Sequence, residues 1–409
     1  MNDNNWYKLD NVAFLFATLR NRKRPNVFRF SCELTDVVDK DWLKIALKET
    51  VQTYPNFHVT LKSGLFWYYY QSSSKDVYVV KEDKPICHKL VYDENDLLYE
   101  VSYYNNRINL EVSHILSDGR GALKFFKLLV NNYIKYRYNE EFRLDVSSSE
   151  LDHIEDSYDK YYQPTNTPKN SFKNIYRYKV PKLGDKTRFY EVHCDLNKII
   201  EIAHRYNTTL TTYLLAVFIY STLKEYKVSD YNKLIKIELP VDLRSFYESE
   251  SLKNFFGIVY IDFRPSKGNL NFEDIIKVVS EQMASRINSG NLESRTNMYV
   301  KFQKLITARI VPLFIKKLVV SNITRILSGK RTTCFSNVGT VIFDENVEKY
   351  IKCISLLSST DDFQFTLISN KNDLCIGISS IYKYNNIVRN FVKLLRDEGV
   401  EIYINTEVV

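Results

Sequence analysis

The stretch INLEVSHILSDGRGALKFFKLL, Ile108 to Leu129, decides the fold because it changes from a strand pattern to a helix pattern across one short turn. Ile108, Leu110 and Val112 alternate with polar residues, which is the period of a strand with one buried face. His114 continues that face where the strand ends, so its imidazole is expected to point inward.

The turn after His114 carries its own helix signals. Ser117 or Asp118 can cap a following helix, and Gly119 and Gly121 permit a tight turn. The apolar stripe of this helix is Ala122, Phe126, Leu129 and Tyr133. A strand-to-helix junction that presents a histidine suits general-base chemistry, although a lone histidine is more often solvated and Asp118 is also explained as a cap alone.

The second half repeats this pattern. LCIGISSIYKYNNIVRNFVKLL, Leu374 to Leu395, aligns with the first stretch without a gap and sets Ser380 opposite His114. Duplication and a chance likeness of two such units both remain open. In either case the sequence predicts α/β halves, of which one carries a base.

A polar, proline-containing segment over 146–182 shows neither the strand nor the helix period. It predicts a crossover between two domains, residues 1–165 and residues 166–409. The other expected elements are strands over 26–34, 57–61, 65–70, 97–104, 188–194, 234–239 and 258–263, and helices over 41–54, 197–206, 209–226, 272–287 and 297–308.

The composition narrows the function class. With 44% hydrophobic residues and a formal charge of +8 over 409 residues, the chain is globular and lacks the concentrated charge of nucleic-acid binders. Its six cysteines form no CxxC pair, so no metal site is expected. Without a secretory pattern, and with 210–223 expected to be a buried helix, a cytoplasmic monomer is predicted.

The motif His114-Ile115-Leu116-Ser117-Asp118-Gly119 resembles the His-x-x-x-Asp-Gly signature of the coenzyme A-dependent acyltransferases, the superfamily of chloramphenicol acetyltransferase. Further segments resemble its alcohol acetyltransferase branch in the same order: WYKLDNVAFLF from Trp6, TYPNF from Thr53, LPVDLRSF from Leu239, NFFG from Asn254 and FSNVG from Phe335. The resemblance implies two α/β lobes, each a mixed sheet with flanking helices, and an active-site tunnel between them.

The resemblance also implies roles for single residues. His114 would be the general base, and Asp118 would pair with an arginine, for which Arg244 is the candidate, to hold the loop together with Gly119. An ordinary surface charge is an equally open reading of Arg244. Ser336 and Asn337 are candidates for steadying an oxyanion in the tunnel, with a plain turn as the alternative.

The expected function is transfer of an acyl group from acyl-coenzyme A, as co-substrate rather than bound cofactor, to a small alcohol or amine. A condensation-type enzyme that uses an acyl carrier protein with a phosphopantetheine arm, and an inactive scaffold, are the alternatives. Ser113 stands where condensation domains and wax ester synthases carry a second histidine, which weakens an amide-forming or wax-ester assignment.

A basic stripe accompanies these motifs. No acidic residue lies between Glu293 and Asp344, where nine lysines and arginines occur. Within it, Lys316 and Lys317 are candidates for binding the phosphates of coenzyme A, an acidic carrier protein or an anionic membrane surface. A solvated basic face explains the stripe equally well.

Overall fold

The computed structural model describes residues 6–19, 25–143, 154–163, 174–265, 271–288, 310–327 and 331–409, with residues 290, 292, 297, 300 and 301. Its helices are α1 (Asn11–Leu19), α2 (Lys40–Thr53), α3 (Gly119–Tyr138), α5 (Ser157–Lys160), α6 (Leu196–Arg205), α7 (Leu210–Leu223), α8 (Phe272–Arg286), α11 (Leu313–Leu327), α12 (Glu345–Glu348) and α13 (Asn386–Asp397), with the short turns η1 (Pro55–Phe57), η2 (Val228–Asp230) and η3 (Leu243–Ser245). Its strands are β1 (Trp6–Lys8), β2 (Val27–Leu34), β3 (Val59–Ser63), β4 (Tyr68–Ser72), β5 (Val79–Lys81), β6 (Tyr99–Tyr104), β7 (Arg107–Ser113), β8 (Arg188–Asp195), β9 (Ile235–Asp242), β10 (Phe256–Phe263), β11 (Thr333–Val341), β12 (Ile351–Ser358), β13 (Phe363–Asn370), β14 (Asp373–Ser380) and β15 (Ile402–Val408).

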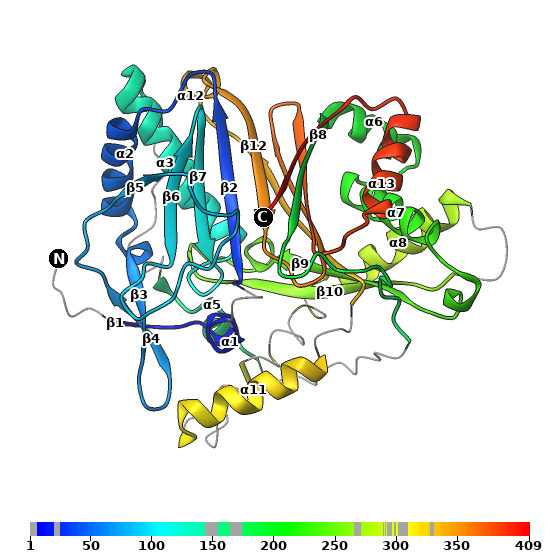
Figure 1. The fold of residues 1–409 in the computed structure, drawn as a ribbon, viewed down its shortest axis with the longest axis horizontal. Coiled ribbons are helices and arrows are strands. Elements are labelled where there is room, and N and C mark those ends of the chain that lie inside the picture. Colours follow the sequence, from blue (N-terminus) through cyan, green and yellow to red (C-terminus); the bar gives the residue numbers. More distant parts are fainter. Residues whose placement is uncertain are drawn as a thin grey trace.

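The first lobe is built on a five-stranded sheet in the order β12-β2-β7-β6-β5. β5 runs parallel to β6, and the other pairs are antiparallel, so the sheet is mixed. α2 and α3 cover one face (Figure 1). The stripe of α3 enters the core fully, because Ala122, Phe126, Leu129 and Tyr133 are each inaccessible to solvent. A small sheet, β1-β4-β3, lies below the first.

The second lobe is built on a seven-stranded sheet in the order β10-β9-β11-β13-β14-β8-β15. β11 runs parallel to both of its neighbours, β9 and β13, and the remaining pairs are antiparallel. α6, α7, α8 and α13 lie on the outer side of this sheet (Figure 1). Two lobes with mixed sheets and flanking helices confirm the predicted fold class.

One strand from the second half of the chain belongs to the sheet of the first lobe. β12 comes from the second half of the chain, yet it pairs antiparallel with β2 of the first half, with Ser355 opposite Ser31. Gly377 of β14 makes the close approach possible, because a Cβ there would lie 2.0 Å from the carbonyl oxygen of Leu356 in β12. The boundary between 1–165 and 166–409 stays a prediction.

Most expected elements occur within two or three residues of their predicted bounds, including the strand-turn-helix units β7–α3 and β14–α13. Between β3 and β4 the Gly64 N–H donates to Trp67 O at 2.8 Å, which closes the hairpin loop. The helix expected over 297–308 lies largely outside the described residues. α7 is buried as predicted, and no described helix has the length and apolar character of a membrane span.

Candidate active site

His114 lies directly after β7, at the junction with α3. Its ring is stacked against Phe16 of α1, with 4.9 Å between centroids, and tilted against Phe28 of β2 at 4.5 Å. The His114 N–H donates to Asn26 O at 2.8 Å, which extends the strand pairing by one residue. The imidazole is therefore held between two elements of the first lobe in a half-buried position.

The surroundings keep this imidazole neutral. Burial lowers the pKa of His114 to about 4, although Asp118, Asn254 and the Ser117 backbone favour the charged form. Nδ1 is buried and forms no hydrogen bond within the described part of the chain. At neutral pH the ring can thus accept a proton, which is the state a general base requires.

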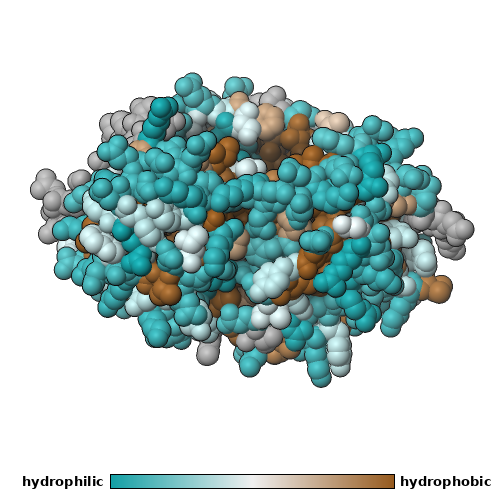
Figure 2. Space-filling model, turned by 90° about the horizontal axis from the view of Figure 1, so that it is seen from above, coloured by the Kyte–Doolittle hydropathy of each residue, from teal (hydrophilic) through white to brown (hydrophobic). Residues whose placement is uncertain are grey.

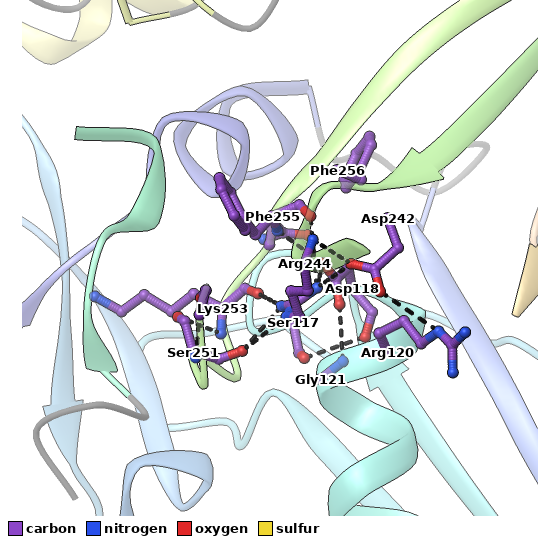
Figure 3. A network of polar contacts seen from close by, with 12 residues as sticks. Ser117, Asp118, Arg120, Gly121, Asp242, Arg244, Ser251, Lys253, Phe255 and Phe256 are labelled. Atoms are coloured by element: carbon purple, nitrogen blue, oxygen red, sulfur yellow. Dashed lines mark hydrogen bonds and ion pairs between the residues drawn. The ribbon is translucent and has the colours of Figure 1, made fainter. Parts of the chain in front are cut away.

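Asp118 uses one carboxylate oxygen within the first lobe and the other to bind the second lobe (Figure 3). Oδ1 accepts from the Gly121 N–H at 2.8 Å and so caps α3. Oδ2 accepts from Arg244 Nη1 at 3.0 Å and from the Phe255 N–H at 2.7 Å, both in the second lobe. The carboxylate is therefore committed to structure and is not left to face a substrate.

Arg244 is buried, with 10% of its side chain exposed. Besides Asp118 it reaches Asp242 Oδ1 at 3.0 Å, and its Nη2 donates to Ser251 O at 2.9 Å and to Lys253 O at 2.7 Å. Figure 3 shows the guanidinium between the Asp118 loop and this second-lobe loop. The geometry places it as the partner of Asp118, not as a surface charge.

Two glycines let the second lobe approach the junction. A Cβ on Gly121 would lie 2.2 Å from Leu252 O, the same oxygen that accepts a hydrogen bond from Ser117 Oγ. A Cβ on Gly119 would lie 3.2 Å from Val338 Cγ2 of β11, a milder contact that a side chain can relieve. The loop at 251–255 and β11 thus both close against the first turn of α3.

Asp10 and Asn254 complete the support of His114. Asp10 caps α1 through the N–H groups of Val12 and Ala13, at 2.9 and 2.7 Å. Asn254 Nδ2 donates to Asp10 Oδ2 at 3.0 Å and to His114 O at 3.1 Å. Burial raises the pKa of Asp10 to about 7, with Asp156 adding to the rise. Asp10 was missed as a site residue, although an Asp before an apolar helix is a cap signal.

Solved structures share this architecture from end to end. F. graminearum TRI101 complexed with coenzyme A and T-2 mycotoxin is 12% identical and has a TM-score of 0.65, over 97% of this chain and 99% of that chain. The trichothecene 15-O-acetyltransferase TRI3 of Fusarium sporotrichioides is 11% identical with a TM-score of 0.62, over 96% and 94% of the two chains. The first condensation domain of the CDA synthetase is 13% identical with a TM-score of 0.62, over 97% of each. The sequence matches no protein-family model and no curated protein.

The chain has the fold of the CoA-dependent acyltransferases. In this acyltransferase fold, Ser336 and Asn337 lie on β11, next to a bulge between Asn337 and Gly339. Asn337 Nδ2 donates to Thr211 Oγ1 at 2.9 Å, and Asn337 Oδ1 accepts from the Gly339 N–H at 2.8 Å. The segment is a bulged strand rather than the plain turn of the alternative. Its role toward an oxyanion stays a prediction.

Lys316 and Lys317 lie on α11, at the periphery of the acyltransferase fold (Figure 1). Lys316 Nζ donates to Phe66 O at 2.8 Å, and Lys317 Nζ lies 5.1 Å from the centroid of the Tyr68 ring. Both lysines therefore contact the β3–β4 hairpin. Binding of coenzyme A phosphates by these lysines stays a prediction.

A group of possible metal ligands lies on other strands of the acyltransferase fold. Donor atoms of His193, Cys353 and Asp373 come within 4.8 Å of one another. His193 Nδ1 and Asp373 Oδ2 are already joined by a 2.9 Å hydrogen bond, and burial raises the pKa of the Cys353 thiol to about 12. Metal ions bind the ionised thiolate, and Cys353 stays a protonated thiol at neutral pH. The group is therefore a weak candidate for a metal site.

Proposed function

We propose that this chain is an acyltransferase that moves an acyl group from acyl-coenzyme A to an alcohol or amine, with His114 as the general base. One observation carries the proposal: a neutral, half-buried imidazole at the β7–α3 junction, fixed from the second lobe through Asp118–Arg244 and Asn254. The fold adds support, because TRI101 was solved with coenzyme A in the same architecture.

The proposed reaction has two steps. His114 removes the proton from the acceptor hydroxyl or amine as its oxygen or nitrogen attacks the thioester carbonyl, giving a tetrahedral oxyanion and an imidazolium. The oxyanion collapses, the carbon–sulfur bond breaks, and the thiolate takes the proton from His114. The products are the ester or amide and free coenzyme A, and the base is regenerated.

The supporting residues have distinct parts in this proposal. Asp118, Gly119 and Arg244 fix the backbone that carries His114, while Ser336 is the candidate donor to the oxyanion. Asn337 is the weaker candidate, because its amide already binds Thr211 and Gly339. An uncharged base in a half-buried setting also limits the water that competes with the acceptor.

The test is release of free thiol from acyl-coenzyme A, measured with a thiol reagent against pooled alcohols and amines, with products identified by mass. His114→Ala should lower the turnover about 10² to 10⁴-fold, the usual worth of a general base. His204→Ala is the matched control, because His204 lies exposed at the end of α6. Turnover that survives His114→Ala, or no acceptor-dependent thiol release by the native chain, would exclude the proposal.

Carrier-bound donors are a second candidate, favoured by the likeness in fold to condensation domains. The same acyl group can be offered on coenzyme A and on a phosphopantetheine-loaded carrier protein in parallel reactions. A carrier donor is supported by a higher kcat/KM for the loaded carrier than for acyl-coenzyme A. Equal use of the free pantetheine thioester would show that the carrier protein itself is not recognised.

A further inference from the structure

α11 carries its apolar side chains on the outside. Phe314 and Leu318 are 65% and 64% exposed, and Ile315 and Val319 lie beside them on the same side of the helix. Leu313 and Val320 face inward and are buried. Large exposed apolar groups that gather on one helix face mark an interaction surface rather than ordinary surface scatter.

The tip of the β3–β4 hairpin continues this face. Leu65 and Trp67 are 69% and 53% exposed, and the tip is bonded to α11 through Leu313 N to Leu65 O and Lys316 Nζ to Phe66 O, each at 2.8 Å. In Figure 1 the hairpin and α11 both extend below the rest of the molecule. We call this the α11 surface; its members are Leu65, Trp67, Phe314, Ile315, Leu318 and Val319.

Lysines border the apolar side chains. At about 100° per residue, Lys316 follows Val319 around the helix and Lys317 precedes Phe314, so one cation lies at each edge of the exposed face. The sequence from Glu293 to Asp344 contains no acidic residue in between, and Val51 to Lys75, which includes the hairpin, contains none either. An apolar stripe with cations at both edges fits the boundary between lipid headgroups and acyl chains.

The opposite side of the molecule has another character. Figure 2 views the molecule from the end away from α11, where hydrophilic side chains dominate and hydrophobic ones show as small separate areas. The face shown in Figure 2 thus has no continuous apolar stripe like that of the α11 surface. A bilayer, which is flat and wide, is contacted by one face of a protein in this way.

We propose that the α11 surface binds an anionic lipid bilayer, with α11 lying along the headgroup region and Trp67 and Leu65 inserted beside it. The Leu and Phe side chains would be buried among the acyl chains, and Trp67 would lie at the boundary between bilayer and water. The bordering lysines attract anionic headgroups. This inference does not depend on the proposed enzymatic function.

The bound orientation would bring the bilayer close to His114. α11 packs on α1, and α1 carries Phe16, whose ring is stacked on His114. One helix therefore separates the membrane-bound element from the candidate base.

The test is co-sedimentation of the full chain with vesicles of phosphatidylcholine alone and of phosphatidylcholine with phosphatidylserine. The chain should sediment with the anionic vesicles and release in high salt. Phe314→Ser combined with Leu318→Ser should weaken binding about tenfold or more, because two large apolar groups lose their burial. Lys317→Gln should weaken binding to the anionic vesicles alone, by about fivefold.

Ile342→Ser is the matched control. Ile342 is 71% exposed and lies between β11 and α12 in the chain, and α12 lies at the end of the molecule opposite α11 (Figure 1). It should bind vesicles like the native chain. The proposal is overturned if the native chain stays in solution with both vesicles, if Ile342→Ser weakens binding equally, or if sedimentation without lipid shows a dimer that Phe314→Ser with Leu318→Ser dissociates. That last result would assign the α11 surface to a second copy of the chain.

Discussion

His114 shows how burial and position together set the chemistry of one residue. Strand parity points the ring inward, and Phe16 and Phe28 exclude water from two sides. Desolvation then disfavours the imidazolium more than Asp118 favours it, so the ring is uncharged over the physiological pH range. Asp118 and Asn254 position His114 through its backbone, so the ring needs no ion pair to be held in place.

The pH dependence follows from this lowered pKa. If His114 is the base, kcat/KM should keep its neutral-pH value on acidification until the pH approaches about 4, well below the ordinary imidazole value of 6.5. Initial rates of thiol release in buffers across that range measure it. An acid limb centred near 6.5 would contradict the buried, neutral imidazole.

The same shift affects stability. The unfolded chain takes up a proton on this histidine below pH 6.5, whereas the folded chain does so only near pH 4. The contribution of His114 is therefore present above pH 6.5 and is lost as the pH falls from 6.5 to about 4. Urea unfolding of His114→Gln should show a shallower loss over that window than the native chain, and His204→Gln should match the native chain.

The Asp118–Arg244 pair yields a second residue-scale prediction. Arg244→Ala leaves Asp118 Oδ2 with the Phe255 N–H but without its counter-charge, in a buried place. The free energy of unfolding should fall by about 3 to 5 kcal/mol. Asp118→Asn with Arg244→Ala should cost less than the sum of the single changes. Additive losses in this double-mutant cycle would mean that the two side chains do not interact.

At the scale of elements, the two glycines of the β7–α3 junction differ in how much space surrounds them. Gly121→Ala would place a methyl group against the Leu252 carbonyl and should destabilise by roughly 2 to 4 kcal/mol, whereas Gly119→Ala meets only the movable Val338 side chain and should cost under about 1 kcal/mol. Thermal unfolding of both variants measures the difference. Equal losses would show that the loop at 251–255 yields easily.

The sequence predicted elements well where apolar and polar side chains recur with the period of a strand or of a helix. The strand at Val27–Leu34 and the helix at Gly119–Tyr138 have clear periods, and both were found. α11 was not predicted, because apolar residues lie on its outer face as well as its inner face, which leaves no period to detect. Arg244 was found through its motif, but the link from Asp10 to Asn254 crosses 244 positions, and no local pattern reports it.

At the scale of the whole molecule, a second ion pair joins the lobes at the end of β7 opposite His114. Arg107 of β7 binds Glu191 of β8 at 2.8 Å, and the Ser355 hydroxyl of β12 donates to the same carboxylate. Burial alone would raise the pKa of Glu191, but Arg107 and Ser355 outweigh it and hold the value below the usual range. The pair therefore stabilises the folded form when Glu191 is ionised.

Removal of this pair should lower the stability of the whole fold. Arg107→Ala should lower the free energy of unfolding by about 3 kcal/mol at neutral pH, because Glu191 is left charged and buried without its counter-charge. Since the folded pKa of Glu191 is depressed, the stabilisation is present above pH 4.5 and is lost as the pH falls further. The gap between native and variant unfolding curves should close in acid, and a gap that persists there would point to lost packing instead.

The whole-molecule arrangement was predictable as two α/β lobes, because both halves show the strand-turn-helix pattern. The pairing of β12 with β2 was not, since the residues that meet are more than 300 positions apart and each strand reads as belonging to its own half. The exact lobe boundary depends on such long-range contacts.

The position of β12 late in the chain determines when the sheet of the first lobe can be completed during translation. Until Ile351–Ser358 has been synthesised, β2 is an open sheet edge with unpaired N–H and C=O groups. The first lobe therefore exposes an aggregation-prone sheet edge during most of translation. Chaperone demand should be highest for ribosome-bound chains shorter than Ile351, and supplying the β12 segment in trans should relieve it.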